Sequence, residues 1–189
     1  MVAKNFTKKL KQEFEKHEAE RRQIISLSNI ALYDSKRAIF SLHRGDVKKA
    51  KDSLLEIEKI LKKLETKFGR ARILEEGAYK AGAEEYAEAK FFSLFLAGKK
   101  VDKIKEVNLN FDSCLGGLCD FTGELVRRAI NMAAAGDIKE VEKIKKVIND
   151  ILAELVEFNM AGYLRTKYDQ AKGNLRKIEQ IDYEIKIRR

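Results

Sequence analysis

The 189-residue chain contains no proline, so the residue that most strongly interrupts a helix is missing from its whole length. Apolar side chains between Phe6 and Leu42 recur at helical spacing. This pattern stops at Gly45–Asp46, where a glycine suits the end of one helix and an aspartate suits the start of the next. The same pair recurs at Gly136–Asp137, and no stretch alternates with the period of two that is typical of strands. The sequence therefore predicts an all-α protein.

Further glycines divide the rest of the chain into helical segments. The predicted helices span 47–68, 70–97, 110–135, 138–159 and 163–187. A first helix of about 40 residues would be about 60 Å long, roughly twice the span of a small domain. The other helices can cover only part of its apolar stripe, so we expect a partner subunit. The prediction is a single-domain antiparallel helical bundle over residues 1–189 that forms a homo-oligomer.

Composition excludes several classes of protein. Apolar residues make up 44% of the chain, which is too many for a disordered protein. Cys114 and Cys119 are the only cysteines, which excludes a small secreted scaffold held together by disulfides. No window of about 18 residues is apolar and uncharged, and the first residues lack the apolar core of a signal peptide. We expect a soluble, cytoplasmic protein that does not enter a membrane.

The net charge of +9 is unevenly distributed along the chain. Residues 1–44 carry ten basic and five acidic side chains, residues 162–189 carry eight and four, and the middle of the chain is neutral. Positive charge concentrated at both ends suits a polyanionic partner such as nucleic acid. It suits equally a well-solvated surface that keeps the protein in solution. Charge alone does not separate these interpretations.

Two acidic residues interrupt an apolar face of the helix expected near 77–97. On a helical wheel, Glu85 falls at the centre of a stripe of small and apolar side chains, and Glu88 lies at its edge. Glu84 and Lys90 fall outside the stripe, where solvated charges are expected. Burying an isolated carboxylate is costly, so Glu85 should be neutralised, paired or bound to a metal.

The helix expected at 110–135 has a similar feature. Asp120 and Glu124 are four residues apart and share a face with Gly116 and Gly117. Two glycines beside two carboxylates leave room for a close approach by another helix or by a ligand. If the two helices face each other, their four carboxylates form an anionic site with oxygen ligands only.

The ligand types available restrict the chemistry. His17 and His43 are the only histidines and are expected to be surface or interface polar residues, so imidazole ligands are missing. Hard oxygen ligands without imidazole or thiolate favour Mg²⁺ or Mn²⁺. These ions commonly serve phosphodiester cleavage, in which the metal polarises the phosphate and activates a water. The same carboxylates could instead form ordinary salt bridges with Arg127 or Arg128, which wheel position alone favours.

Aromatic side chains cluster in one further segment. Tyr86, Phe91, Phe92 and Phe95 follow the two glutamates of the 77–97 helix. Their helical spacing predicts core residues, not a platform on which bases stack.

Four segments, in this order along the chain, resemble the translin family. They read ERRQIISLSNIALYDSKRAIFSLHRGD, GAEEYAEAKFFSLFL, GLCDFTGELVRRAIN and LRTKYDQAKGNLRKIEQIDYEIKIRR. The resemblance covers nearly the whole length and implies a seven-helix fold in a closed, barrel-like octamer. It implies nucleic-acid binding as well, since translin binds single-stranded RNA and DNA.

The chain is most similar to the catalytic branch of that family, translin-associated factor X (TRAX). Members of this branch carry a Glu-x-x-Glu pair and a later Asp-x-x-x-Glu pair, which Glu85, Glu88, Asp120 and Glu124 match. The resemblance therefore implies a metal-dependent ribonuclease and favours metal ligands over salt bridges at these four positions. The chain lacks the long extensions of animal TRAX proteins and looks like a compact archaeal or microbial form.

The leading hypothesis is a Mg²⁺-dependent endoribonuclease that cleaves short single-stranded RNA, with DNA binding left open. Glu85, Glu88 and Asp120 would bind metal, and Glu124 would complete the site or orient the attacking water. Candidate phosphate contacts are Arg21, Arg22, Lys36, Arg37, Arg165, Lys167 and Lys172, and Arg127 is a candidate for steadying the scissile phosphate. The alternatives are a non-catalytic single-stranded RNA- and DNA-binding protein, and a purely structural helical oligomer.

Overall fold

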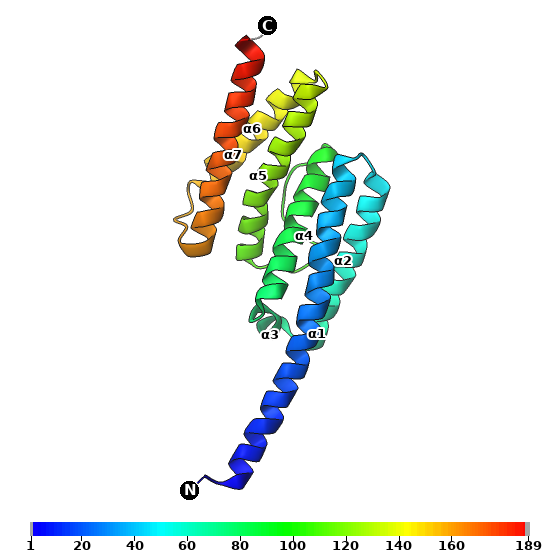
Figure 1. The fold of residues 1–189 in the computed structure, drawn as a ribbon, viewed down its shortest axis with the longest axis vertical. Coiled ribbons are helices and arrows are strands. Elements are labelled where there is room, and N and C mark those ends of the chain that lie inside the picture. Colours follow the sequence, from blue (N-terminus) through cyan, green and yellow to red (C-terminus); the bar gives the residue numbers. More distant parts are fainter. Residues whose placement is uncertain (1, 188–189) are drawn as a thin grey trace.

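A computed structural model describes residues 2–187, and this part of the chain contains helices and no strand (Figure 1). The helices are α1 (Lys4–His43), α2 (Val47–Phe68), α3 (Arg70–Leu74), α4 (Gly77–Leu96), α5 (Phe111–Ala134), α6 (Ile138–Leu155) and α7 (Gly162–Ile187). The prediction of an all-α fold with a first helix of 40 residues is confirmed. Helix α6 ends at Leu155, before the predicted end at 159.

The two glycine–aspartate turns have the same local structure. Gly45 has φ +79°, and the N–H of Asp46 donates to the carbonyl of Ser41 at 2.9 Å, which closes α1. The Asp46 carboxylate then accepts the N–H of Lys49 at 3.1 Å, which caps α2. Gly136–Asp137 repeats this arrangement between α5 and α6, with φ +79° at the glycine. The short-range signals in the sequence therefore placed both turns correctly.

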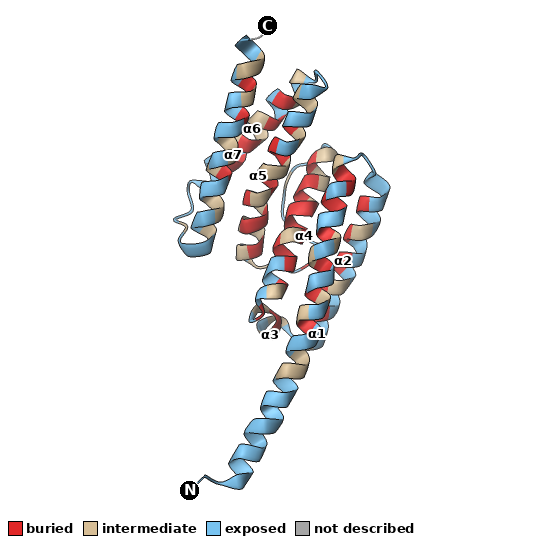
Figure 2. Cartoon of the chain, viewed as in Figure 1, coloured by how far each residue is buried: buried red, intermediate tan, exposed pale blue. Residues whose placement is uncertain are grey.

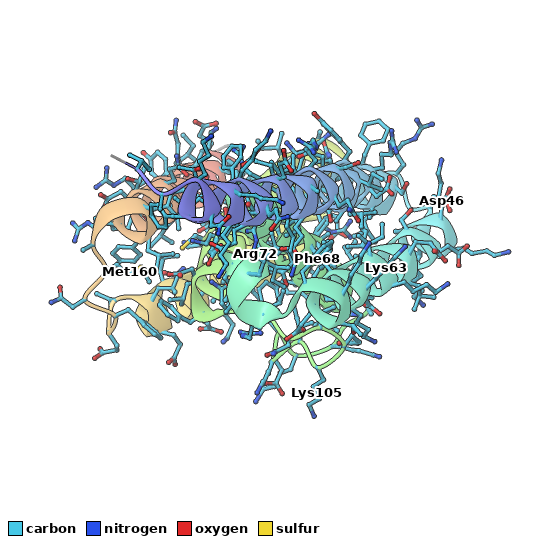
Figure 3. All side chains as sticks on the ribbon, turned by 90° about the horizontal axis from the view of Figure 1, so that it is seen from below. Asp46, Lys63, Phe68, Arg72, Lys105 and Met160 are labelled. Atoms are coloured by element: carbon cyan, nitrogen blue, oxygen red, sulfur yellow. The ribbon has the colours of Figure 1, made fainter. Side chains whose placement is uncertain are left out.

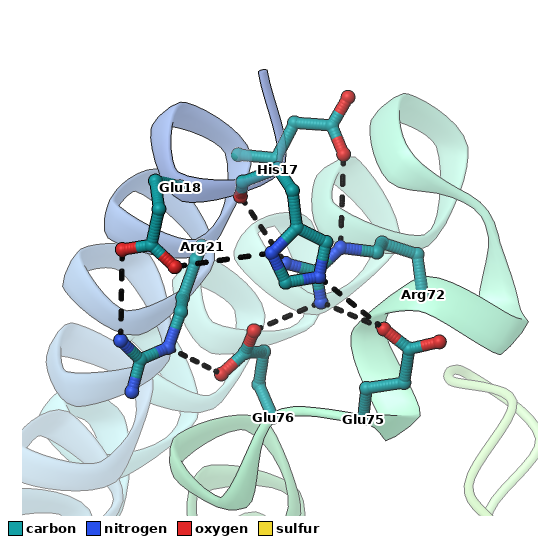
Figure 4. A network of polar contacts seen from close by, with 7 residues as sticks. His17, Glu18, Arg21, Arg72, Glu75 and Glu76 are labelled. Carbon is teal, nitrogen blue, oxygen red and sulfur yellow. Dashed lines mark hydrogen bonds and ion pairs between the residues drawn. The ribbon is translucent and has the colours of Figure 1, made fainter. Parts of the chain in front are cut away.

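The prediction of one continuous helix over 70–97 is wrong, because the chain breaks at Glu75 and Glu76 between α3 and α4. The Arg72 guanidinium pairs with Glu76 at 2.8 Å and with Glu20 of α1 at 3.6 Å. Arg21 of α1 approaches Glu76 at 3.5 Å, and Figure 4 shows the resulting network. The break is thus held by ion pairs to a distant helix, which the local sequence does not reveal.

Helix α4 lies in the middle of the bundle. It packs against α1 on one side and α5 on the other, while α2 covers α1 and the pair α6 and α7 covers α5 (Figure 1). Consequently α4 is buried over most of its circumference (Figure 2). Tyr86, Phe91, Phe92 and Phe95 are all buried, as predicted for core residues.

The first part of α1 extends beyond the other helices (Figure 2). Its apolar residues Phe6, Leu10 and Phe14 are 59%, 48% and 65% exposed, so this chain alone does not cover the stripe.

The loop that carries Lys105 lies on the side of the molecule away from α1 (Figure 3). None of the described helices is both long enough and apolar enough to cross a membrane.

Candidate functional site

Two glycines bring α4 and α5 into close contact. A Cβ atom on Gly116 would lie 2.0 Å from Oε2 of Glu84, and one on Gly117 would lie 2.8 Å from the backbone oxygen of Glu84. A larger side chain at Gly117 would push the two helices apart, and one at Gly116 would displace the Glu84 side chain. The close approach expected at Gly116 and Gly117 is therefore made by helix α4.

This contact places the four predicted carboxylates in one neighbourhood. Glu88 is 7% exposed, and its pKa is raised to about 9, first by burial and then by the negative charges of Glu85, Asp120 and Glu124. The pKa of Glu85 is raised as well, mainly by burial, with Asp120 and Glu124 adding to the effect and Lys36 opposing it. The site therefore holds more negative charge than its surroundings neutralise.

Glu84 is a fifth carboxylate at this site, and the prediction that it is solvated is wrong. Its side chain is 8% exposed and accepts a hydrogen bond from the Tyr163 hydroxyl at 2.5 Å. It also pairs with the Lys167 ammonium at 2.9 Å. Glu84 is buried because α7 returns across the junction of α4 and α5, a tertiary contact with no local sequence signal. The prediction that Lys90 is solvated is also wrong, since its ammonium pairs with the buried Glu58 of α2 at 2.8 Å.

Lys167 supplies the central positive charge of the cluster. Its ammonium group hydrogen-bonds Asp120 as well as Glu84, so it joins α7 to both acidic helices. Burial alone would lower the pKa of Lys167, but its hydrogen bonds to Asp120, Glu84 and Tyr163 outweigh burial and raise it. The sequence predicted Lys167 as a phosphate contact on an open basic surface, whereas the structure places it against carboxylates.

Three further basic side chains border the cluster. The His43 side chain is 5% exposed and hydrogen-bonds Glu124, so the expectation of a surface or interface residue is wrong. Its ring lies 4.7 Å from the ring of Phe92, which fixes its orientation. Lys36 lies 4.0 Å from Glu85, and Arg127 lies 3.6 Å from Glu124. Helix α1 therefore reaches both acidic pairs.

The cluster suits a hard divalent cation by its charge and its oxygen-only donors. Glu88 has no hydrogen bond or ion pair to another side chain within residues 2–187; the residue is 7% exposed, and its carboxyl oxygens keep some contact with solvent. The side chains are nevertheless too far apart to enclose a metal ion. Within the described region, no group of three acidic, histidine or cysteine side chains is close enough to hold one. Lys167 and His43 each occupy an oxygen that a metal would otherwise use.

The other predicted phosphate contacts are spread over three places. Arg21 pairs with Glu18 and Glu76, and Arg22 lines a groove of about 520 Å³ with Lys63 and Lys67. Lys36 and Arg37 line a second groove farther along α1. On α7, Arg165 and Lys172 both pair with Asp169. The structure thus does not bring all seven predicted phosphate contacts together. Tyr33 and Phe40, the two aromatic side chains that line the second groove with Lys36, were not among the predicted residues.

Relatives of known sequence span different shares of the chain. The model of the Translin family matches residues 19–189. Mouse translin-associated protein X is 25% identical in an alignment covering 100% of this chain and 78% of the relative. An uncharacterized protein from Methanocaldococcus jannaschii is 28% identical over 83% of this chain and 72% of its own. Chicken translin is 30% identical over 49% of this chain, and the match covers 41% of that relative, less than half of its length.

Solved structures share the whole fold. AfC3PO has a TM-score of 0.88 at 24% identity, covering 97% of this chain and 98% of the other. A complex of AfC3PO with duplex RNA gives 0.84 at 24% identity, with 97% of each chain covered. The structure of apo-NeC3PO gives 0.86 at 22% identity, covering 98% of this chain and 99% of the other. With a family match over nearly the whole length and this common fold, the chain belongs to the translin family.

Proposed function

We propose that this protein binds RNA and cleaves it as a Mg²⁺-dependent endoribonuclease of the TRAX type. The observation that carries the proposal is Glu88, which is 7% exposed, has no ion pair within residues 2–187 and shares its neighbourhood with Glu85, Asp120 and Glu124. A purely structural bundle gains nothing from such an arrangement, because enclosing an unpaired carboxyl among other acidic groups lowers stability. The relation to translin-associated protein X and to a C3PO solved with duplex RNA supports RNA as the substrate.

Glu85, Glu88, Asp120 and Glu124 would hold the cation. Bound Mg²⁺ or Mn²⁺ would polarise the scissile phosphate and lower the pKa of a water at the site. His43 orients Glu124, and Lys167 holds Asp120 beside Glu84, so that side chains of α1 and α7 fix the acidic residues of α5. Arg127, half-exposed beside Glu124, is placed to meet a phosphate that approaches from solvent.

The surrounding basic surface would hold the RNA backbone. Arg22 with its groove, Lys36 and Arg37 on α1, and Arg165 and Lys172 on α7 form separate patches, each of which suits phosphates of a strand. Contacts to phosphate carry little sequence information, so binding should tolerate many sequences and weaken as salt rises. The exposed apolar stripe of α1 at Phe6, Leu10 and Phe14 suits burial against another subunit, in keeping with a homo-oligomer.

Cleavage of a labelled single-stranded RNA tests the proposal. The wild type should cut in Mg²⁺ or Mn²⁺ and not in EDTA, and Glu85→Gln should abolish cutting while RNA binding is kept. Glu179→Gln removes the same charge from the exposed surface of α7 and serves as the matched control. Absence of cutting by the wild type in either metal would refute the nuclease.

One observation favours a second function, the non-catalytic binding of single-stranded RNA or DNA. Lys167 and His43 already hydrogen-bond Asp120 and Glu124, so these two carboxylates have partners without a metal. This alternative predicts salt-dependent binding of RNA with no cleavage under any condition, and with no effect of Glu85→Gln. A purely structural role would give no salt-dependent affinity for RNA.

A further inference from the structure

Two exposed aromatic side chains lie among basic residues on the outer face of α1. Tyr33 and Phe40 are 59% and 52% exposed. They are seven residues apart and so project from one side of the helix, about 10.5 Å from each other along its axis. No role in the bundle core accounts for them.

These rings line a shallow groove between α1 and the start of α2, made of two hollows that share three lining residues. One part, of about 340 Å³, is lined by Tyr33, Lys36, Arg37, Phe40, Ser41 and Lys49. The adjoining part, of about 350 Å³, shares Phe40, Ser41 and Lys49 and adds Arg44 and Asp46. Four basic side chains line the two parts, namely Lys36, Arg37, Arg44 and Lys49, against one acidic side chain, Asp46, which caps α2. The lining therefore has a net positive charge.

The ring of Phe40 already contacts a planar cation. The guanidinium carbon of Arg44 lies 5.5 Å from the centre of that ring, and Phe40 is still 52% exposed. A nucleobase is also a planar group, and stacking on an exposed aromatic ring suits any of the four bases. Alternation of aromatic and basic side chains thus fits a single nucleic-acid strand, with bases on the rings and phosphates on the cations.

Lys36 connects this groove to the acidic site. The same side chain lines the groove and lies 4.0 Å from Glu85. We propose that Tyr33 and Phe40 form a platform on the outer face of α1 on which bases of single-stranded RNA stack, with Lys36, Arg37 and Lys49 holding the adjoining phosphates and Lys36 lying between the platform and Glu85. The platform rests on the proposed function, for which it names one part of the surface that holds the RNA.

Anisotropy of a fluorescent single-stranded oligoadenylate, titrated in EDTA so that no cleavage occurs, tests the platform. Tyr33→Leu and Phe40→Leu keep an apolar side chain but remove the aromatic face, and each should weaken binding by about five- to a hundred-fold. The dependence of affinity on salt should stay unchanged in both variants, because no phosphate contact is lost. Phe158→Leu is the matched control, since Phe158 is 50% exposed but lies in the segment after α6, outside the groove.

A second readout reports stacking itself. An oligonucleotide carrying 2-aminopurine should lose fluorescence when it binds the wild type and keep it on the Phe40→Leu variant. Equal affinity and equal quenching in the wild type and both variants would overturn the platform but leave the nuclease proposal intact. Failure of the wild type to bind RNA would overturn both. Smaller assemblies of Tyr33→Leu and Phe40→Leu in analytical ultracentrifugation, with RNA affinity unchanged per subunit, would overturn the platform and identify the face as a contact between subunits.

Discussion

Replacing Glu88 by glutamine should stabilise the metal-free protein, and more so at higher pH. The pKa of this carboxyl is raised from 4.5 to about 9, first by burial and then by Glu85, Asp120 and Glu124. Between these values the folded protein keeps a proton on Glu88 that the unfolded chain releases. Rising pH therefore favours unfolding of the wild type. Glutamine carries no such proton, so Glu88→Gln escapes this penalty.

The size of the effect follows from the two pKa values. Inside the window between 4.5 and about 9, each pH unit lowers the stability of the wild type by about 1.4 kcal/mol relative to the variant. From pH 6 to pH 8 the gap in free energy of unfolding should thus widen by about 3 kcal/mol. Such a gain on removing a native side chain is the expected mark of a residue kept for function at the expense of stability.

Urea unfolding followed by circular dichroism at 222 nm measures this gap. The titrations need EDTA, to remove cations that would favour the ionised form, and one protomer concentration, since assembly affects apparent stability. Glu179→Gln, on the exposed surface of α7, should differ from the wild type by the same amount at both pH values. A gap for Glu88→Gln that stays constant between pH 6 and pH 8 would refute the view that Glu88 is buried among like charges.

Two other substitutions test the packing of the site. Gly117→Ala should destabilise the protein by about 1–3 kcal/mol, because its Cβ would meet the Glu84 backbone at 2.8 Å. Gly123→Ala on the same helix should stabilise it by about 0.5–1 kcal/mol, since the nearest atom is 3.5 Å away. Equal urea midpoints for the two variants would contradict the close contact of α4 and α5. Lys167→Met should cost about 3 kcal/mol by leaving Asp120 and Glu84 without their shared cation. Added Mn²⁺ should restore more stability to Lys167→Met than to the wild type, and an unchanged midpoint for the variant would show that Lys167 does not hold the cluster.

Local signals in the sequence were sufficient for most of the helices and for the two glycine–aspartate turns. The pairs Gly45–Asp46 and Gly136–Asp137 determine their turns through their own backbone and side-chain hydrogen bonds, so their positions could be predicted from a few neighbouring residues. The break at Glu75 and Glu76 could not, because the partners of Arg72 and Glu76 lie on α1, more than fifty residues away.

The helical wheel was a poor guide to α4 for a related reason. It assumes one apolar face, but α4 has neighbours on most sides, so Glu84 and Lys90 are as enclosed as residues of the stripe. Glu85, predicted at the centre of that stripe, retains 22% of its side-chain exposure. The spacing of the acidic pairs still identified the right helices, since Gly116 and Gly117 marked where those helices meet. Tyr33 and Phe40 were not predicted as binding residues, although their basic neighbours Lys36 and Arg37 were predicted as phosphate contacts.

Helix α1 contacts both acidic helices, through Lys36 to Glu85 and through His43 to Glu124. One continuous helix therefore carries the groove on its outer side and, on its inner side, basic side chains that contact the acidic cluster. Binding of the strand and its cleavage would depend on the same helix. Replacing all of α1 to change which nucleotides are preferred would also disturb the acidic cluster, so selectivity is better redesigned by single substitutions.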